Sequence, residues 1–112
     1  MEGKIITTIL PQDVKQKIRP VLVLREFPKY GDLLVCGISS QLHQYIEGFD
    51  IIINEQHPDF KNSGLKHPGI CRLNFLALLP KNKFLGELGY ISAVAHTTLL
   101  KNLSHYLVAN IK

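Results

Sequence analysis

Arginine and asparagine stand two residues apart inside an otherwise apolar run, "GICRLNFLALLP", at residues 69–80. In a strand, positions i and i+2 point to the same face, so Arg72 and Asn74 are predicted to point the same way. The opposite face then carries their neighbours Cys71, Leu73 and Phe75. A guanidinium matches the geometry of phosphate and carboxylate groups, so the Arg72 face could line an anion site. The alternative is a half-exposed strand with a solvated face, which is the commoner setting for a strand arginine.

A second arginine and a pair of hydroxyl groups could serve the same chemistry. Arg19, in "QKIRPVLVL", directly precedes Pro20, and a residue before proline is held in an extended conformation. Arg19 is therefore expected at the entry of a strand, where the alternative is again a solvated charge. Ser39 and Ser40, in "GISSQL", follow an apolar run and add hydrogen-bonding hydroxyls.

Metal and nucleotide motifs are missing from the sequence. The five histidines show neither His-Glu-x-x-His spacing nor a neighbouring pair of cysteines two residues apart: His43, His57, His67, His96 and His105. There is no glycine-rich phosphate loop, no Gly-x-Ser-x-Gly elbow and no dinucleotide fingerprint. We therefore expect no metal and no cofactor.

The elements that must position these residues are short, β-branched apolar runs separated by turn signals rich in Pro, Asn, Asp and Gly. Many short strands at such spacing indicate a small antiparallel barrel or sandwich, so the fold class is α+β and mainly β. At 112 residues, the whole chain, 1–112, is expected to be one domain. The predicted strands cover residues 4–10, 20–26, 32–39, 49–53, 70–79 and 84–91.

A helix is predicted at the end of the chain, from Ala93 to about Asn110. This stretch has no Gly or Pro up to residue 109, and Ser92 precedes it as a candidate cap. Apolar residues recur at helical spacing, which predicts a stripe packed on the barrel. The stripe consists of Ala95, Leu99, Leu103, Tyr106 and Leu107.

Composition bears on the partners and the location of the protein rather than on its chemistry. The net charge of +4 permits a polyanionic partner without requiring one. No apolar run reaches the roughly 18 residues of a membrane span, and the start "MEGKIITT" lacks the sections of a signal peptide. A cytoplasmic protein is therefore expected. Cys36 and Cys71 lie inside apolar runs, so they are expected to be buried thiols.

Three segments together resemble the PemK/MazF/Kid family of toxin endoribonucleases: "KIRPVLVL", "DLLVCGISSQ" and "SGLKHPGICRLNFLALLPKNKFLGELGYIS". They occur in the family's order and span almost the whole chain. The resemblance implies an SH3-like antiparallel barrel with a C-terminal helix, assembled as a homodimer. It also implies metal-independent cleavage of single-stranded RNA, and neutralisation by a cognate antitoxin with an acidic, flexible segment.

The family's site residues carry over to specific positions of this chain. Arg19 matches the arginine of the Arg-Pro motif, Ser39 matches a Thr or Ser after a strand, and Arg72 matches the arginine of an Arg-x-Asp motif. Asn74 stands where Kid-like members have the Asp, and an amide cannot accept a proton as a carboxylate does. Gly69 stands where a Ser is commoner. The residues expected to bind RNA are Lys15, Lys17, Ser40, His67 and Asn74.

The mechanism that the resemblance implies is attack of the RNA 2′-hydroxyl on the adjacent phosphorus, which gives a 2′,3′-cyclic phosphate and a 5′-hydroxyl. Arg19 and Arg72 would stabilise the phosphoryl charge, and Ser39 would bind a phosphate oxygen or orient the attacking hydroxyl. Asp13 and His67 are both candidates for the proton acceptor.

Several alternatives stay open at this point. Phe27 and Tyr30 could stack on RNA bases or simply pack their own loop. A non-catalytic module that binds RNA or a protein is the competing function, since Asn74 replaces the family carboxylate. A barrel with no toxin role is the third.

Overall fold

The computed structural model describes residues 1–110, so the last two residues of the expected 1–112 domain lie outside it. Between its strands lie two short 3₁₀ turns, at Leu42–Gln44 and Lys81–Lys83, and a four-residue helix, none of which the sequence pattern predicts. The strands are β1 Lys4–Ile9, β2 Ile18–Glu26, β3 Leu33–Ser39, β4 Ile51–Ile53, β5 Gly69–Leu79 and β6 Gly86–Tyr90. The helices are α1 Phe60–Ser63 and α2 Ala93–Val108.

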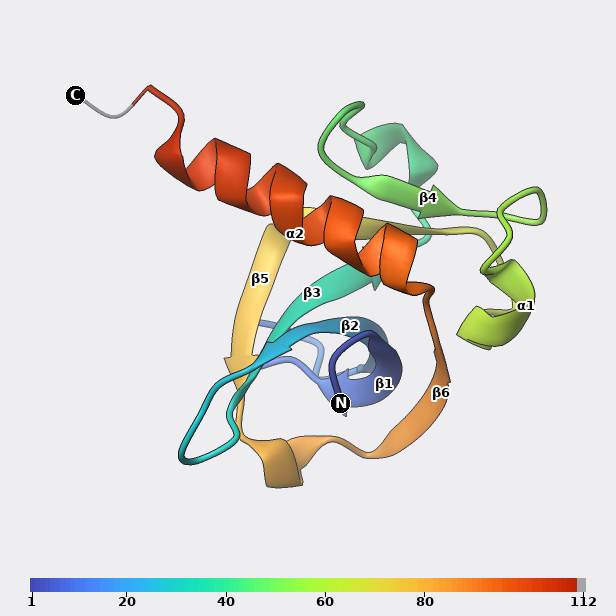
Figure 1. Ribbon diagram of the computed structural model, residues 1–112. Helices are drawn as coiled ribbons and strands as arrows, with labels where there is room; N and C mark the ends of the chain where they lie inside the picture. Colours follow the sequence, from blue (N-terminus) through green and yellow to red (C-terminus); the bar gives the residue numbers. More distant parts are fainter. Residues whose placement is uncertain (111–112) are drawn as a thin grey trace.

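The six strands form one antiparallel sheet in the order β4-β5-β3-β2-β1-β6, and the sheet curls into a half-barrel (Figure 1). The two edge strands of the sheet are β4 and β6. Helix α1 connects these edges, because it follows β4 in the chain and packs on β6. The contact is backbone on backbone: a Cβ at Gly89 would lie 2.0 Å from the carbonyl oxygen of Asn62, and one at Gly64 would lie 2.1 Å from that of Leu88. Only glycine permits this approach. The predicted small antiparallel barrel with a terminal helix is confirmed.

Apolar side chains fill both faces of the sheet, which explains why β2 is apolar without interruption from Val21 to Leu24. Val21 and Val23 point into the half-barrel, while Leu22 and Leu24 point towards α2. Cys36 and Cys71 lie in the layer under α2 as free, fully buried thiols, as predicted. Burial raises the pKa of Cys71 to about 12 and raises that of Cys36 well above its usual value.

Helix α2 lies across the outer face of the sheet (Figure 1). The Ser92 hydroxyl accepts a hydrogen bond from the Ala95 N–H at 3.2 Å, so the predicted cap is confirmed. Ala95, Leu99 and Leu103 are buried as expected, but Tyr106 and Leu107 are exposed. The helix runs past the sheet there, and the Tyr106 ring lies beside that of Phe49, with 5.4 Å between the ring centroids. No helix within residues 1–110 is long and apolar enough to cross a membrane.

Strand β5 contains a large bulge, and the predicted alternation of its side chains is wrong beyond it. Arg72 pairs with Gly37, but the next β3 residue, Cys36, pairs with Leu76, so three β5 residues have no partner on β3. Leu73 stays in the layer under α2, whereas Phe75 turns into the half-barrel. Asn74 is left exposed at the bulge. Phe75 therefore does not share a face with Leu73, as a regular strand would require.

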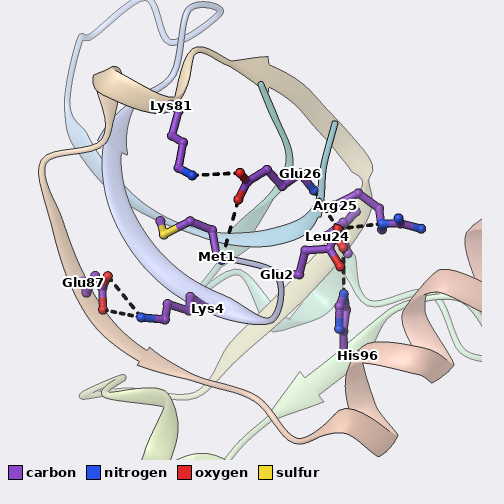
Figure 2. A network of polar contacts seen from close by, with 9 residues as sticks. All are labelled: Met1, Glu2, Lys4, Leu24, Arg25, Glu26, Lys81, Glu87 and His96. Atoms are coloured by element: carbon purple, nitrogen blue, oxygen red, sulfur yellow. Dashed lines mark hydrogen bonds and ion pairs between the residues drawn. The ribbon is translucent and has the colours of Figure 1, made fainter. Parts of the chain in front are cut away.

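The end of β2 remote from Arg19 carries a network of ion pairs (Figure 2). Arg25 donates to Glu2 at 2.7 Å, and Lys81 donates to Glu26 at 2.8 Å. The hydrogen bond from Lys81 lowers the pKa of Glu26. The imidazole Nε2 of His96, on α2, lies 2.7 Å from the Leu24 carbonyl oxygen and joins the helix to the strand. These contacts join β2 to neighbouring segments, and they leave the Arg25 guanidinium paired with Glu2.

Candidate functional site

A cleft of about 760 Å³ opens at the end of the sheet where Arg19 is the second residue of β2 and Ser39 ends β3. Its walls come from the loop before β2 and the start of that strand, from the 37–44 segment, and from residues 64–69, which lead into β5. Among residues 1–110, four cationic side chains and a single carboxylate line it: Lys15, Arg19, Lys66 and Arg72, with Asp13. The cleft is therefore suited to an anion with several charges.

Arg72 is half-buried at the floor of the cleft, opposite Gly37. Its Nε is buried and has no hydrogen-bond partner within residues 1–110. A buried N–H without a partner costs about 1–3 kcal/mol, and such groups are uncommon in folded proteins. The guanidinium is thus held at a stability cost with an unused donor, which is typical of a group that binds a ligand.

Arg19 is oriented by the loop in front of it. Its Nε donates to Asp13 Oδ2 at 3.1 Å, and Asp13 Oδ1 accepts from the Lys15 N–H at 3.0 Å. The hydrogen bond from Arg19 lowers the pKa of the Asp13 carboxyl, with the backbone N–H groups of Lys15 and Lys17 adding to the effect. Asp13 therefore stays ionised and acts as an anchor for Arg19.

Ser39 is held by the segment that follows it. Its hydroxyl donates to the Gln44 side-chain oxygen at 3.1 Å and accepts from the Gln41 N–H at the same distance. Both bonds are local, because Gln44 belongs to the 3₁₀ turn directly after β3. The hydroxyl is thus fixed in direction, and it lines the cleft together with both arginines.

The cleft gathers most of the residues that the sequence indicated. The three expected catalytic residues line it, and so do Lys15, Ser40 and His67. Lys17 and Asn74 are exposed but do not line it. Phe27 and Tyr30 lie in the loop between β2 and β3, at the other end of β2, so they are remote from Arg19. Base stacking by those two aromatics at this cleft is therefore not supported.

Sequence reasoning missed other residues that shape the cleft. Lys66, in the "GLKHP" segment, adds a charge, and Gln44 orients Ser39. Phe75 reaches the cleft only because of the β5 bulge, and Gly37 makes room for it: a Cβ at Gly37 would lie 3.3 Å from its ring. The charge of Lys66 was readable from the sequence. The roles of Phe75 and Gly37 depend on the bulge in β5, which the local sequence pattern does not predict.

No group of three or more His, Cys, Asp or Glu side chains within residues 1–110 could hold a metal ion. The positive charge of the cleft comes instead from guanidinium and ammonium groups. Arginine pairs provide forked donors for phosphoryl oxygens, and the adjacent hydroxyl provides a further hydrogen bond. This set of groups can bind a phosphodiester and stabilise charge that develops on it.

The fold is similar to that of solved structures. Among solved structures, an endoribonuclease in complex with its cognate antitoxin from Mycobacterial species is similar with a TM-score of 0.70 and 11% sequence identity, over 100% of this chain and 98% of that one. The Mycobacterium tuberculosis toxin MazF-mt6 is similar with a TM-score of 0.66 and 20% identity, over 93% and 95% of the two chains. These two likenesses show the fold. A search of curated protein sequences gives no significant match.

The family of the chain follows from the sequence match. Residues 1–107 match the family described as PemK-like, MazF-like toxin of type II toxin-antitoxin system. That range includes every β-strand and all but the last residue of α2. The chain therefore belongs to the PemK/MazF family of type II toxins.

Proposed function

We propose that this protein, acting as one toxin domain, is an endoribonuclease that cleaves single-stranded RNA without a metal ion. The observation that carries the proposal is the cleft, which Arg19, Ser39 and Arg72 all line, and where the buried Arg72 Nε has no hydrogen-bond partner among the described residues 1–110. Family membership supports the toxin role, and one similar structure is that of an endoribonuclease.

The proposed reaction is an internal transfer within the RNA. The 2′-oxygen attacks the adjacent phosphorus while the bond from phosphorus to the 5′-oxygen breaks, leaving a 2′,3′-cyclic phosphate and a 5′-hydroxyl. Arg72 and the terminal nitrogens of Arg19 face the phosphoryl oxygens, where negative charge grows in the transition state. The Ser39 hydroxyl donates its one proton to Gln44, so it either accepts a hydrogen bond from the 2′-hydroxyl and orients it, or turns away from Gln44 to donate to a phosphoryl oxygen. DNA lacks the 2′-hydroxyl, so it is not a substrate.

The reaction also needs an acceptor for the 2′-proton and a donor for the 5′-oxygen. Asp13 is poorly suited to accept the proton, because its pKa is lowered by the hydrogen bond from Arg19. His67 is exposed at the wall of the cleft, and an imidazole can both accept and donate a proton near neutral pH. We therefore propose His67 as the proton acceptor.

RNA binding is proposed to extend beyond the reacting phosphate. Lys15 and Ser40 line the cleft, and Lys17 is exposed in the adjoining loop, where it can reach a neighbouring phosphate. Asn74 is exposed at the bulge, two residues after Arg72 in the chain, and it does not line the cleft. Its proposed contact is therefore with RNA that leaves the cleft.

The proposed partners follow the charge of the same face. A cognate antitoxin with an acidic, flexible segment would occupy the cationic cleft and compete with RNA. One of the similar structures is a complex with its cognate antitoxin. We also propose that the protein acts as a homodimer in the cytoplasm. Simultaneous, independent binding of antitoxin and RNA would contradict the shared cleft.

The decisive experiment is incubation of the purified protein with single-stranded RNA and with DNA of the same sequence, in excess chelator. We expect cleavage of RNA alone, with a cyclic phosphate and a 5′-hydroxyl at the new ends. Arg19→Ala and Arg72→Ala should each lower the rate on the order of a hundredfold, and Ser39→Ala should lower it less. If the folded protein binds RNA but cleaves none, it is the non-catalytic binding module instead.

A further inference from the structure

We infer that Asp50 is a positioning residue for this cleavage: its buried carboxylate holds the backbone beside Arg72 and the segment that orients Ser39. The inference rests on the proposed function. Asp50 lies outside the cleft lining, and its carboxylate accepts hydrogen bonds from the backbone N–H groups of Ile46 and Leu73. It acts through the main chain.

Asp50 is 4% exposed, and each of its carboxylate oxygens accepts one backbone hydrogen bond. Oδ1 accepts from the Leu73 N–H at 3.0 Å, and Oδ2 accepts from the Ile46 N–H at 3.0 Å. A buried carboxylate is expensive unless its oxygens are hydrogen-bonded. Hydrogen bonds to a carboxylate are stronger than those between neutral groups, so Asp50 can hold the two backbone segments that it contacts in a fixed geometry.

The Leu73 N–H needs this acceptor because regular strand pairing stops there. On one side, β4 pairs with β5 only from Ile53 to Ile51, opposite Gly69 to Cys71. On the other side, β3 loses register between its partners Arg72 and Leu76. Leu73 therefore begins the bulge, and the Asp50 carboxylate replaces the missing strand carbonyl. This bond fixes where β5 bends, one residue after Arg72, and so sets the direction of the guanidinium.

The second oxygen reaches the other half of the site. Ile46 ends the short segment after the 3₁₀ turn that contains Gln44, and Gln44 accepts the hydrogen bond of the Ser39 hydroxyl. The Asp50 N–H also donates to the Ile46 carbonyl at 2.9 Å, which closes this loop on itself. One carboxylate thus joins the backbone at Arg72 to the loop at Ser39, and their relative placement depends on it.

A purely structural role for Asp50 is the competing explanation, and the chain offers a matched control. Asp59 is 6% exposed, and its Oδ2 likewise accepts two hydrogen bonds, from the N–H and the hydroxyl of Ser92 at 3.0 and 2.9 Å. It anchors the start of α2 and does not line the cleft. Asp50→Asn and Asp59→Asn each place an amide where a carboxylate accepted hydrogen bonds, so both should reduce stability.

The experiment compares the two variants by steady-state cleavage of a single-stranded RNA, corrected for the folded fraction. For Asp50→Asn we expect kcat to fall on the order of tenfold to a hundredfold with KM changed less than about threefold, because misplacement weakens transition-state contacts most. Asp59→Asn should cleave at close to the wild-type rate. In an Arg72→Ala background, Asp50→Asn should lower kcat by a smaller factor than in the wild type, because the part of its effect that acts through that arginine is already lost and only the part that acts through the Ser39 loop remains.

A second readout does not depend on cleavage. The NMR signal of the Arg72 Nε–H should shift in Asp50→Asn and stay in place in Asp59→Asn. Equal kcat losses in the two variants, or an unmoved Arg72 signal, would overturn the inference. Absence of cleavage by the folded wild type would instead overturn the proposed function, while the Arg72 signal still decides the positioning. If Asp50→Asn does not fold, Asp50→Glu, which moves both oxygens by one methylene, takes its place in both measurements.

Discussion

Replacement of Arg72 by methionine should separate the function of this guanidinium from its contribution to stability. The Arg72 side chain is half-buried, and its buried Nε makes no hydrogen bond within residues 1–110. In the unfolded chain that N–H is hydrated, so folding loses about 1–3 kcal/mol at this atom. Methionine keeps the length of the apolar stem and removes the unpaired donor. We expect the free energy of unfolding of Arg72→Met to stay unchanged or to rise by about 1 kcal/mol.

The same substitution should abolish most of the cleavage. A donor aimed at developing phosphoryl charge contributes roughly 3–4 kcal/mol to transition-state stabilisation, which corresponds to a loss of about 10²–10³-fold in rate. Urea denaturation measures the first quantity, and single-turnover cleavage of single-stranded RNA measures the second. The substitution is thus expected to lower the cleavage rate without lowering the free energy of unfolding, because the buried Arg72 Nε–H has no hydrogen-bond partner within residues 1–110.

Arg25→Met is the matched control for Arg72→Met. The Arg25 guanidinium is exposed at the other end of β2 and is paired with Glu2 at 2.7 Å (Figure 2). Its loss should reduce stability by less than about 1 kcal/mol and leave cleavage unchanged. The reasoning is refuted if Arg72→Met destabilises the fold by more than about 2 kcal/mol, since Arg72 would then be a structural residue. It is equally refuted if both variants cleave alike.

Further predictions concern three other groups. Because the pKa of Asp13 lies below its usual value of 3.8, its pair with Arg19 should persist in weak acid and be lost only as pH falls below that value, which NMR of the Arg19 Nε–H can follow. Asp13→Asn should lower kcat roughly fivefold without weakening RNA binding, because it frees Arg19 while removing a negative charge; weaker binding would contradict this. The buried Cys71 keeps its proton up to a pKa of about 12 while an unfolded thiol loses it near 9.0, so the free energy of unfolding should fall as pH rises between these values. At about pH 10.5 the loss from Cys71 is about 2 kcal/mol, and a Cys71→Ala variant with an equally steep alkaline decline would disprove it. Asn74→Asp should change cleavage less than about threefold, because Asn74 is exposed outside the cleft; a large gain would show that the family carboxylate acts from this position.

Local sequence pattern predicted the strands and the helix because period-2 and helical spacing record which side chains are buried. The uninterrupted run at Val21–Leu24 fits a strand that is covered on both faces. The pattern failed at Phe75, since a bulge resets the alternation without leaving a glycine or proline in the run. It also failed at Tyr106 and Leu107, because helical spacing shows which residues share a face but not where the underlying sheet ends.

The candidate site was predictable only through resemblance. Arg19, Ser39 and Arg72 lie far apart in the chain, and no spacing rule connects them; the sheet order places β5, β3 and β2 side by side and so brings them together. The structure also explains the glycine at the start of β5. A Cβ at position 69 would lie 2.7 Å from the Cγ2 atom of Ile38, so a side chain there would require Ile38 to move.

The two arginines of the cleft are prepared in different ways, and both ways follow from nearby carboxylates. Asp13 takes the Nε of Arg19, which orients that guanidinium and leaves its terminal nitrogens for a ligand. Asp50 instead binds the backbone next to Arg72, and the Nε of that side chain has no hydrogen-bond partner in the described part of the chain. Asp13 is paired with Arg19 and Asp50 is buried outside the cleft lining, so each carboxylate repels an anion in the cleft less than an unpaired carboxylate of the lining would. In the proposed site, acidic residues therefore orient the cationic groups before the anion binds, at a limited cost in repulsion.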